Sequence, residues 1–518
     1  MPISSGVGPD RGDSELGAFA PPVGLPAPPL PPPPAPPPPP PPPSPEARPS
    51  HRVRNRWIAT AVGGALVVAA ITGIGVLVDQ PPKQPADWDP RVADLVEFVQ
   101  NERGLLYDHP VPIDFLTEQQ YSERVAGRDK LTDDDVAQLE QVEGEMRAFG
   151  LVNGDVDLVA SMGTLQDEGT LAYYDPDAER ITVRGTEMTP ALRVTLVHEL
   201  THVLQDQHFD LRQLDDFEGS DPEAGFRALA EGDATRIENR YVDSLDSADR
   251  KAYDDATAAQ SDTAGDELST VPDALVAYFG APYVLGTDLV DLLDQTGGDK
   301  AINQAFDIPP DSEAMLLDPF RFLDGDAASD VPVPALEPGE EKVDDGDMGA
   351  IALLLLLEGQ LDPHDALDGV DAWDGDAYVG FTRDGRACVR VAIATVDAPG
   401  AGRLDQLLTE WSAAVPAADA TVSRDDTTVT FETCDPGANA TAVKAGLSGT
   451  ALALPVIRNE IALEVIHDGA DPDVARCLSG RVVNEYSVDE LLAADPAQFQ
   501  TAEFFQQVSG FAQECSGG

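Results

Sequence analysis

The pentapeptide His198–His202, with the sequence HELTH, constrains the fold of this chain more than any other feature. Thr189 is a predicted N-cap and Pro190 a favoured first helical residue. An apolar stripe with helical spacing follows them, at Leu192, Leu196, Val197, Leu200, Val203 and Leu204. Two imidazoles four residues apart leave the same face of a helix. Burying them beside a carboxylate is costly unless the groups are partnered, and a metal ion satisfies all of them.

The HExxH pattern on a helix is typical of zinc-dependent hydrolysis. In such a site the two neutral imidazoles, here His198 and His202, hold Zn²⁺, which activates water. Glu199 then takes a proton from the water and passes it to the leaving amine. The alternative is a chance match on an amphipathic helix, which is uncommon in a chain with only 7 His.

A catalytic zinc needs a third protein ligand, and the sequence offers two candidates. His208 has the spacing of HExxHxxGxxH, but this chain has Gln205 where that pattern needs Gly. A helix that continues past Gln205 places His208 about 9 Å along the axis from His202, on another face. Glu231 lies on a second predicted helix, from Asp221 to about Tyr241, in small-residue surroundings that allow close helix packing. We predict Glu231 as the third ligand, with an ordinary solvated Glu as its alternative role.

The oxyanion that develops on a scissile carbonyl needs a donor besides zinc. Tyr283 is our first candidate, because it lies in a stretch flanked by Gly and Pro, although a half-buried aromatic is its alternative role. Spacing does not choose between it and the other candidates, which are Tyr241, Arg236, Arg240 and His208.

A hairpin is predicted just before the HELTH helix. Leu171–Tyr174 and Arg180–Val183 flank the turn residues Asp175–Asp177. A strand that leads into such a helix can pair with an extended peptide by strand addition.

At these helices the chain resembles the HExxH-plus-Glu zinc metallopeptidases, the gluzincins. More narrowly, it resembles uncharacterised secreted or membrane-anchored peptidase-like proteins that carry HELTHxLQDQ and EGDA, here His198–Gln207 and Glu231–Ala234. Degenerate versions of later motifs of that group are Ala281–Gly286, Gly297-Gly298, Pro310–Glu313 and Ala372–Asp376. The resemblance implies a zinc peptidase. Thermolysin-like enzymes have an acidic residue four positions after the third ligand, where this chain has Thr235.

The N-terminal region predicts a membrane anchor. Residues 1–50 are of low complexity, and residues 1–56 are expected to form a disordered, Pro-rich tail. Its nearly continuous Pro tract, from Pro31 to Pro43, favours a polyproline II spacer or a ligand for an SH3-like partner. About 22 apolar or small residues follow at 57–78, long enough for a single transmembrane helix. Three Arg before them orient the tail to the cytoplasm and the later residues outside it. We expect a single-pass protein of the cell membrane.

The rest of the chain predicts an α+β fold in three parts. Residues 79–330 are expected to form a mainly helical, zincin-like peptidase domain with a small antiparallel sheet. A Pro- and acid-rich linker at 331–346 leads to an α+β region at 347–518, with short strands such as Val389–Ala394 and Thr427–Phe431.

The C-terminal region holds all four Cys, and an even number of Cys outside the cytoplasm favours two disulfides. Sequence proximity favours the pairs Cys388–Cys434 and Cys477–Cys515. The other pairings and a four-Cys zinc site are the alternatives, although no CxxC occurs.

Charge excludes one class of function. With 93 acidic and 33 basic residues, the net charge of −60 excludes a general nucleic-acid-binding protein, which needs a basic surface. Such acidity is compatible with Ca²⁺ binding, but no EF-hand pattern occurs.

We therefore expect a membrane-anchored, extracytoplasmic, zinc-dependent peptidase that acts on peptide or protein substrates with Glu199 as general base. The alternative is a catalytically inactive envelope protein that binds or organises partners and keeps the zinc-type helix as structure. An intact Glu199 favours the enzyme, because a structural site has no use for a general base.

Overall fold

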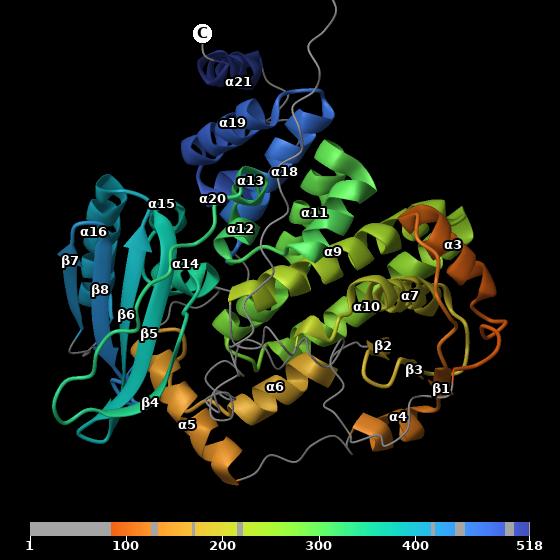
Figure 1. Ribbon diagram of the computed structural model, residues 1–518, viewed down its shortest axis with the longest axis horizontal. Helices are drawn as coiled ribbons and strands as arrows, with labels where there is room; N and C mark the ends of the chain where they lie inside the picture. Colours follow the sequence, from red (N-terminus) through yellow and green to blue (C-terminus); the bar gives the residue numbers. More distant parts are fainter. Residues whose placement is uncertain are drawn as a thin grey trace, which may run out of the picture. The chain divides into compact units, whose positions relative to one another are not determined.

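The computed structural model describes residues 84–125, 133–167, 171–214, 221–415, 420–440, 451–492 and 502–516. All of them belong to one compact unit. They form helices and two β-sheets, which is the expected α+β class (Figure 1). The Pro-rich tail at 1–56 and the apolar segment at 57–78 lie outside the described residues.

The predicted fold class also included a single N-terminal transmembrane helix, and this part of the prediction is wrong for the chain that the structure describes. Within those ranges no helix is both long and apolar enough to cross a membrane. Helix α14 (Ala350–Glu358) is almost wholly apolar but has only 9 residues. Helix α11 (Asp273–Asp307) has 35 residues, but Asp288, Asp291 and Asp294 interrupt its apolar positions.

The first sheet has three strands, β1 (Ile113–Leu116), β2 (Ala172–Asp175) and β3 (Arg180–Arg184), in the order β1-β3-β2. The antiparallel pair β2 and β3 confirms the predicted hairpin. Strand β1 pairs with β3 in parallel, so the sheet is mixed and not antiparallel as expected. Strand β2 lies at the edge of this sheet and packs against α7.

Helix α7 (Pro190–Phe209) carries the HELTH sequence and confirms the predicted helix. The Thr189 hydroxyl accepts a hydrogen bond from the Leu192 N–H at 3.2 Å, and Pro190 occupies the first turn. The helix ends at Asp210, whose φ of 55° is left-handed. The predicted apolar stripe is buried along its whole length.

Helix α9 (Asp221–Ser244) packs against both α7 and α11. Its contact with α11 is made backbone to backbone, because a Cβ at Gly232 would lie 2.1 Å from the Gly286 carbonyl oxygen. A Cβ at Gly286 would in turn lie 2.2 Å from the Ala228 carbonyl oxygen. Only glycine allows this approach, which brings the side chains of α11 next to those of α9.

The second sheet is antiparallel, with the order β4-β5-β6-β8-β7. Its strands are β4 (Glu341–Gly346), β5 (Trp373–Arg383), β6 (Arg386–Thr395), β7 (Thr421–Asp425) and β8 (Thr428–Cys434). Strand β4 therefore occupies the end of the expected linker. The main hydrophobic core joins residues on both sides of that linker, such as Phe226 on α9 and Phe431 on β8.

The remaining helices surround these elements. Helices α16 and α5 contact the second sheet, and α3 and α10 contact α7. Their bounds are α3 (Ala93–Arg103), α4 (Glu118–Val125), α5 (Asp133–Ala148), α6 (Leu158–Asp167), α10 (Ser247–Leu268), α12 (Ala314–Leu317), α13 (Phe320–Asp324), α15 (Pro363–Asp371), α16 (Ala398–Ala414), α18 (Ala453–His467), α19 (Pro472–Glu485), α20 (Val488–Leu492) and α21 (Ala502–Cys515).

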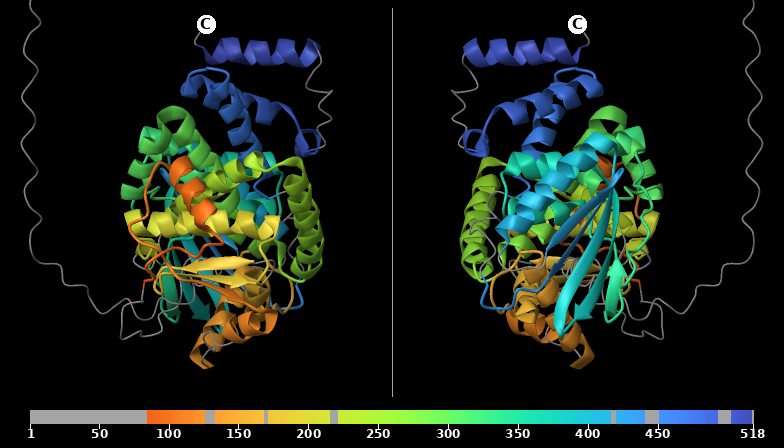
Figure 2. Two further views of the ribbon diagram at one scale, coloured as in Figure 1. Left: turned by 90° about the vertical axis from the view of Figure 1, so that its right-hand side faces the viewer. Right: turned by 90° about the vertical axis from the view of Figure 1, so that its left-hand side faces the viewer.

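Both predicted disulfides are confirmed. Cys388 and Cys434 are directly opposite each other on β6 and β8, and both are fully buried. Cys477 and Cys515 join α19 to α21, which lies over α19 (Figure 2).

Two of the later sequence motifs hold the start of α14. The first backbone N–H groups of a helix have no partner within the helix. The Glu313 carboxyl accepts a hydrogen bond from the Ile351 N–H at 2.8 Å, and the Asp376 carboxyl accepts from Met348 at 2.6 Å and Gly349 at 3.0 Å. Burial raises the pKa of Glu313 to about 7 and that of Asp376 to about 6. We assign a structural role to both.

Candidate metal centre

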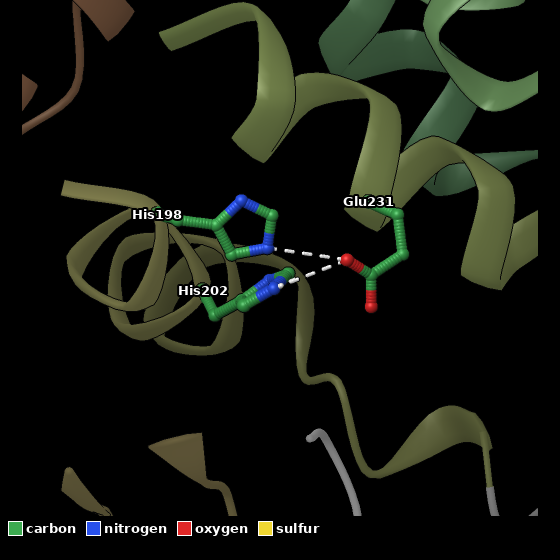
Figure 3. A group of neighbouring side chains, drawn as sticks. All are labelled: His198, His202 and Glu231. Atoms are coloured by element: carbon green, nitrogen blue, oxygen red, sulfur yellow. Dashed lines mark hydrogen bonds and ion pairs between the residues drawn. The ribbon is translucent and has the colours of Figure 1, made fainter. Parts of the chain in front are cut away.

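His198 and His202 on α7 and Glu231 on α9 converge on one point (Figure 3). Their ligand atoms all lie within 4.8 Å of one another. Glu231 Oε2 is 3.2 Å from His198 Nε2 and 3.5 Å from His202 Nε2. Ligands at zinc-bond lengths in a tetrahedron are separated by about 3.3 Å. The distances from Glu231 to the two histidines therefore match those between ligands of a tetrahedral metal ion.

The outer nitrogen of His198, which is Nδ1 and points away from the metal position, contacts a carboxylate that was not predicted from the sequence. Glu238 Oε2 accepts a hydrogen bond from His198 Nδ1–H at 2.9 Å. With the proton on Nδ1, Nε2 presents its lone pair to the metal position. Thr235, at the position that is acidic in thermolysin-like enzymes, lies one turn before Glu238 on α9.

The outer nitrogen of His202 is held by Gln205. The Gln205 amide N–H₂ donates to the Ala230 carbonyl at 2.9 Å and to the Asp233 carboxylate at 3.0 Å, and both partners only accept hydrogen bonds here. Its Oε1 therefore faces His202 Nδ1, at 2.9 Å. A proton of this imidazole is thus placed on Nδ1, so that Nε2 is the nitrogen that can ligate a metal ion.

Asp233 is held in turn by two arginines. Arg103 Nε donates to it at 2.8 Å and Arg236 Nη2 at 3.2 Å. Although burial raises the pKa of Asp233, the two guanidinium groups outweigh it and hold the pKa below the ordinary value. Asp233 is therefore an anion that fixes the Gln205 amide.

The charges of the three candidate ligands are coupled. Burial raises the pKa of Glu231, but the imidazoles of His202 and His198 outweigh it and hold the pKa well below its usual range. Burial lowers the pKa of His198, but hydrogen bonds to Glu231 and Glu238 outweigh it and raise the pKa well above its usual range. A proton on His198 therefore competes with a metal ion for the same site.

Two buried polar atoms of the candidate ligands have no hydrogen-bond partner, which bears on whether a metal ion fits the site. His202 Nε2 and Glu231 Oε1 have no hydrogen-bond partner, although both residues are 0% exposed. An unpaired buried polar atom is costly. A cation between the two helices would satisfy His202 Nε2, so the site fits a metal ion on geometry, donor type and buried polar atoms.

Glu199 lies between the two histidines in sequence and is buried, at 4% exposure. The backbone N–H of Tyr174 on β2 donates a hydrogen bond to its Oε2 at 2.7 Å. Burial raises the pKa of Glu199 to about 7, partly offset by electrostatic interactions with His198 and His202. The carboxylate is thus held by the edge strand and is poised to exchange a proton near neutral pH.

Tyr283 on α11 is the predicted oxyanion donor, and the structure brings it to the same place. Burial raises the pKa of its hydroxyl well above the ordinary value, and the carboxylates of Glu231 and Glu199 raise it further. The guanidinium of Arg227 acts in the opposite direction. Tyr283 therefore stays protonated beside the metal group, as a hydrogen-bond donor must.

The other candidates from the sequence have different partners. His208 Nε2 donates to the Leu106 carbonyl oxygen at 2.8 Å, and His208 is not in the metal-ligating group. The Tyr241 hydroxyl accepts a hydrogen bond from Arg193 Nε at 2.9 Å. Arg236 pairs with Asp233, Asp294 and Asp299, and Arg240 with Asp294 and Glu102.

Sequence reasoning missed Glu238, Gln205 and Asp233. A signal for Glu238 was present, because seven residues are about two helical turns and place it on the face of Glu231. No pattern in the sequence indicated that Gln205 and Asp233 contact each other, since they lie on different helices.

In the part of the chain that the structure describes, this is the one group of three or more His, Cys, Asp or Glu side chains that could hold a metal ion. No protein-family model, no curated protein and no solved structure matches the chain.

Proposed function

We propose that this protein is a zinc-dependent peptidase in which His198, His202 and Glu231 hold the metal and Glu199 is the general base. The observation that carries the proposal is the placement of Glu199, which is buried on the ligand helix and held by the Tyr174 N–H instead of by a metal-ligating group. Two imidazoles and one carboxylate are a donor set typical of catalytic zinc, which keeps a further position open.

Zinc bound to such a set supplies Lewis acidity, which activates water and polarises a carbonyl. Glu199 takes the proton of the attacking water and returns it to the leaving amine. Burial raises its pKa to about 7 when no cation is bound, which favours both transfers near neutral pH. Tyr283 donates a hydrogen bond to the oxygen that gains charge.

A peptide as substrate is supported by the position of β2. This strand lies at the edge of its sheet and packs against α7, and edge strands bind extended peptides through main-chain hydrogen bonds. We also propose that the protein acts in an oxidising compartment, because its two disulfides are characteristic of such compartments.

The test compares the wild-type protein with Glu199→Gln in a peptide-library cleavage assay, with metal content measured by mass spectrometry. We expect about one zinc per chain in both proteins, cleavage by the wild type, and a rate at least about 100-fold lower in the variant. If zinc-loaded wild type cleaves no peptide, or if Glu199→Gln cleaves at the wild-type rate, the peptidase proposal is wrong, and the first result favours a binding role.

A further inference from the structure

Arg227 is a buried cation on α9 with an unused hydrogen-bond donor. It is 3% exposed, and its Nη2 donates to Glu223 Oε1 at 2.8 Å. Its Nη1 is also buried and has no hydrogen-bond partner. A buried guanidinium nitrogen without an acceptor costs free energy, so this atom is a candidate for contact with a ligand.

The position of Arg227 places it next to the metal centre. It precedes Glu231 by four residues, which in an α-helix is about 6 Å along the axis and about 40° around it. Both side chains therefore lie on the same side of α9. The pKa of Tyr283 on α11 responds to Glu231, Glu199 and Arg227, so Arg227 is close enough to the metal centre to act on it electrostatically.

The carboxylates of the metal centre leave Arg227 Nη1 without a partner. The proposed base, the third ligand and the residue that holds His198 are carboxylates, namely Glu199, Glu231 and Glu238. None of them pairs with Arg227, whose one ion pair in the described part of the chain is with Glu223. A guanidinium presents its donors as a planar fork that matches a carboxylate, and Glu223 uses Nη2 of this fork.

We propose that Arg227 Nη1 binds a carboxylate of the peptide substrate and thereby selects peptides with an anionic group near the scissile bond. The inference rests on the proposed peptidase function and names the substrate class of that site. The carboxylate can come from the C-terminus of the peptide or from an Asp or Glu side chain, because both offer the same two oxygen atoms.

The test measures peptide binding in the Glu199→Gln background, which is expected to keep zinc but not to turn over. The probes are short peptides of one sequence, taken from a cleaved member of the library. They are made with a C-terminal acid or amide, and with Asp or Glu replaced by Asn or Gln. We expect the anionic form to bind about 10- to 100-fold more tightly than its neutral counterpart, and Arg227→Gln to abolish this preference. If the C-terminal amide weakens binding, the bound carboxylate is the C-terminus. If Asn or Gln weakens binding, it is the Asp or Glu side chain.

Arg240→Gln is the matched control, because it removes the same charge from the same helix at a more exposed position that pairs with Asp294 and Glu102. It should keep the preference for anionic peptides. If Arg227→Gln fails to fold, Arg227→Lys replaces it, since Lys keeps the charge without the planar fork, and a weaker preference is expected.

The inference is overturned if the protein that retains Arg227 shows no preference for anionic peptides, or if Arg227→Gln keeps the preference unchanged. In those cases Nη1 contacts a neutral carbonyl or serves packing alone. A failure of the peptidase proposal is a different result, because zinc-loaded wild type then cleaves no peptide at all.

Discussion

Glu238 Oε2 lies 2.9 Å from Nδ1 of His198, seven residues beyond the candidate ligand Glu231 on the same helix. Thermolysin-like enzymes have their acidic residue four positions after the third ligand, where this chain has Thr235. Two helical turns return to nearly the same face, so the Glu238 carboxylate reaches His198 from one turn beyond Thr235. A carboxylate on the outer nitrogen of a ligating histidine fixes its tautomer and makes it a stronger ligand.

Replacing Glu238 should therefore weaken zinc binding without removing a ligand. We expect Glu238→Ala to lower zinc affinity by about 10- to 100-fold, because His198 loses its orienting partner. Thr235→Ala, on the neighbouring turn, should leave the affinity unchanged. Competition with a chromophoric chelator at fixed pH measures both values, and equal affinity for wild type and Glu238→Ala would contradict the assignment.

Replacing Gln205 should also weaken zinc binding, because Gln205 orients His202. Gln205→Met keeps a side chain of similar length but removes the acceptor from Nδ1, so His202 is free to change tautomer. We expect zinc affinity to fall by about 10-fold or more. The control is Gln207→Met, because Gln207 contacts Asp108 and His109 instead. A loss of equal size in the control would mean that the effect is general destabilisation of α7.

The pH dependence of hydrolysis should follow the ionisation of Glu199. A general base acts only when deprotonated, so kcat/KM should rise as pH rises through the pKa of this group. Burial raises that pKa to about 7, and a bound cation lowers it, so the midpoint is expected at or below about pH 7. The measurement is kcat/KM with excess zinc and with metal content checked at each pH, since protonated His198 competes for the metal. A rate that falls across this range would exclude Glu199 as the base.

The contact between α9 and α11 should depend on Gly286. Gly286→Ala places a methyl group 2.2 Å from the Ala228 carbonyl oxygen, so the helices must separate. We expect a loss of stability of about 1–3 kcal/mol or more, together with weaker zinc binding. Gly280→Ala is the matched control on the same helix, because nothing lies within 4 Å of its added Cβ. It should be neutral or stabilise the protein by about 0.5–1 kcal/mol. Thermal and urea unfolding measure both, and equal stability of the two variants would contradict the packing argument.

Patterns that are local in the sequence predicted their structures well. The Thr189 cap, the α7 stripe and the β2–β3 hairpin depend on neighbouring residues, and each formed as expected. The sequence did not predict the parallel pairing of β1 with β3, because more than 60 residues separate Ile113 from its partner Ile181. It also did not predict that Glu341–Gly346 would form a strand, because its acidic composition is typical of a linker.

The sequence by itself determined that His198 and His202 share one face of a helix with Glu199 beside them, because helical periodicity alone places residues four apart together. The tertiary structure decided which residues meet this pair from elsewhere: Glu231 and Glu238 from α9, and Tyr283 from α11. It also turned His208 toward Leu106. The reason is physical, since contacts between helices depend on how closely and in which register they pack. For α9 and α11, the backbone contact of Gly232 with Gly286 sets both.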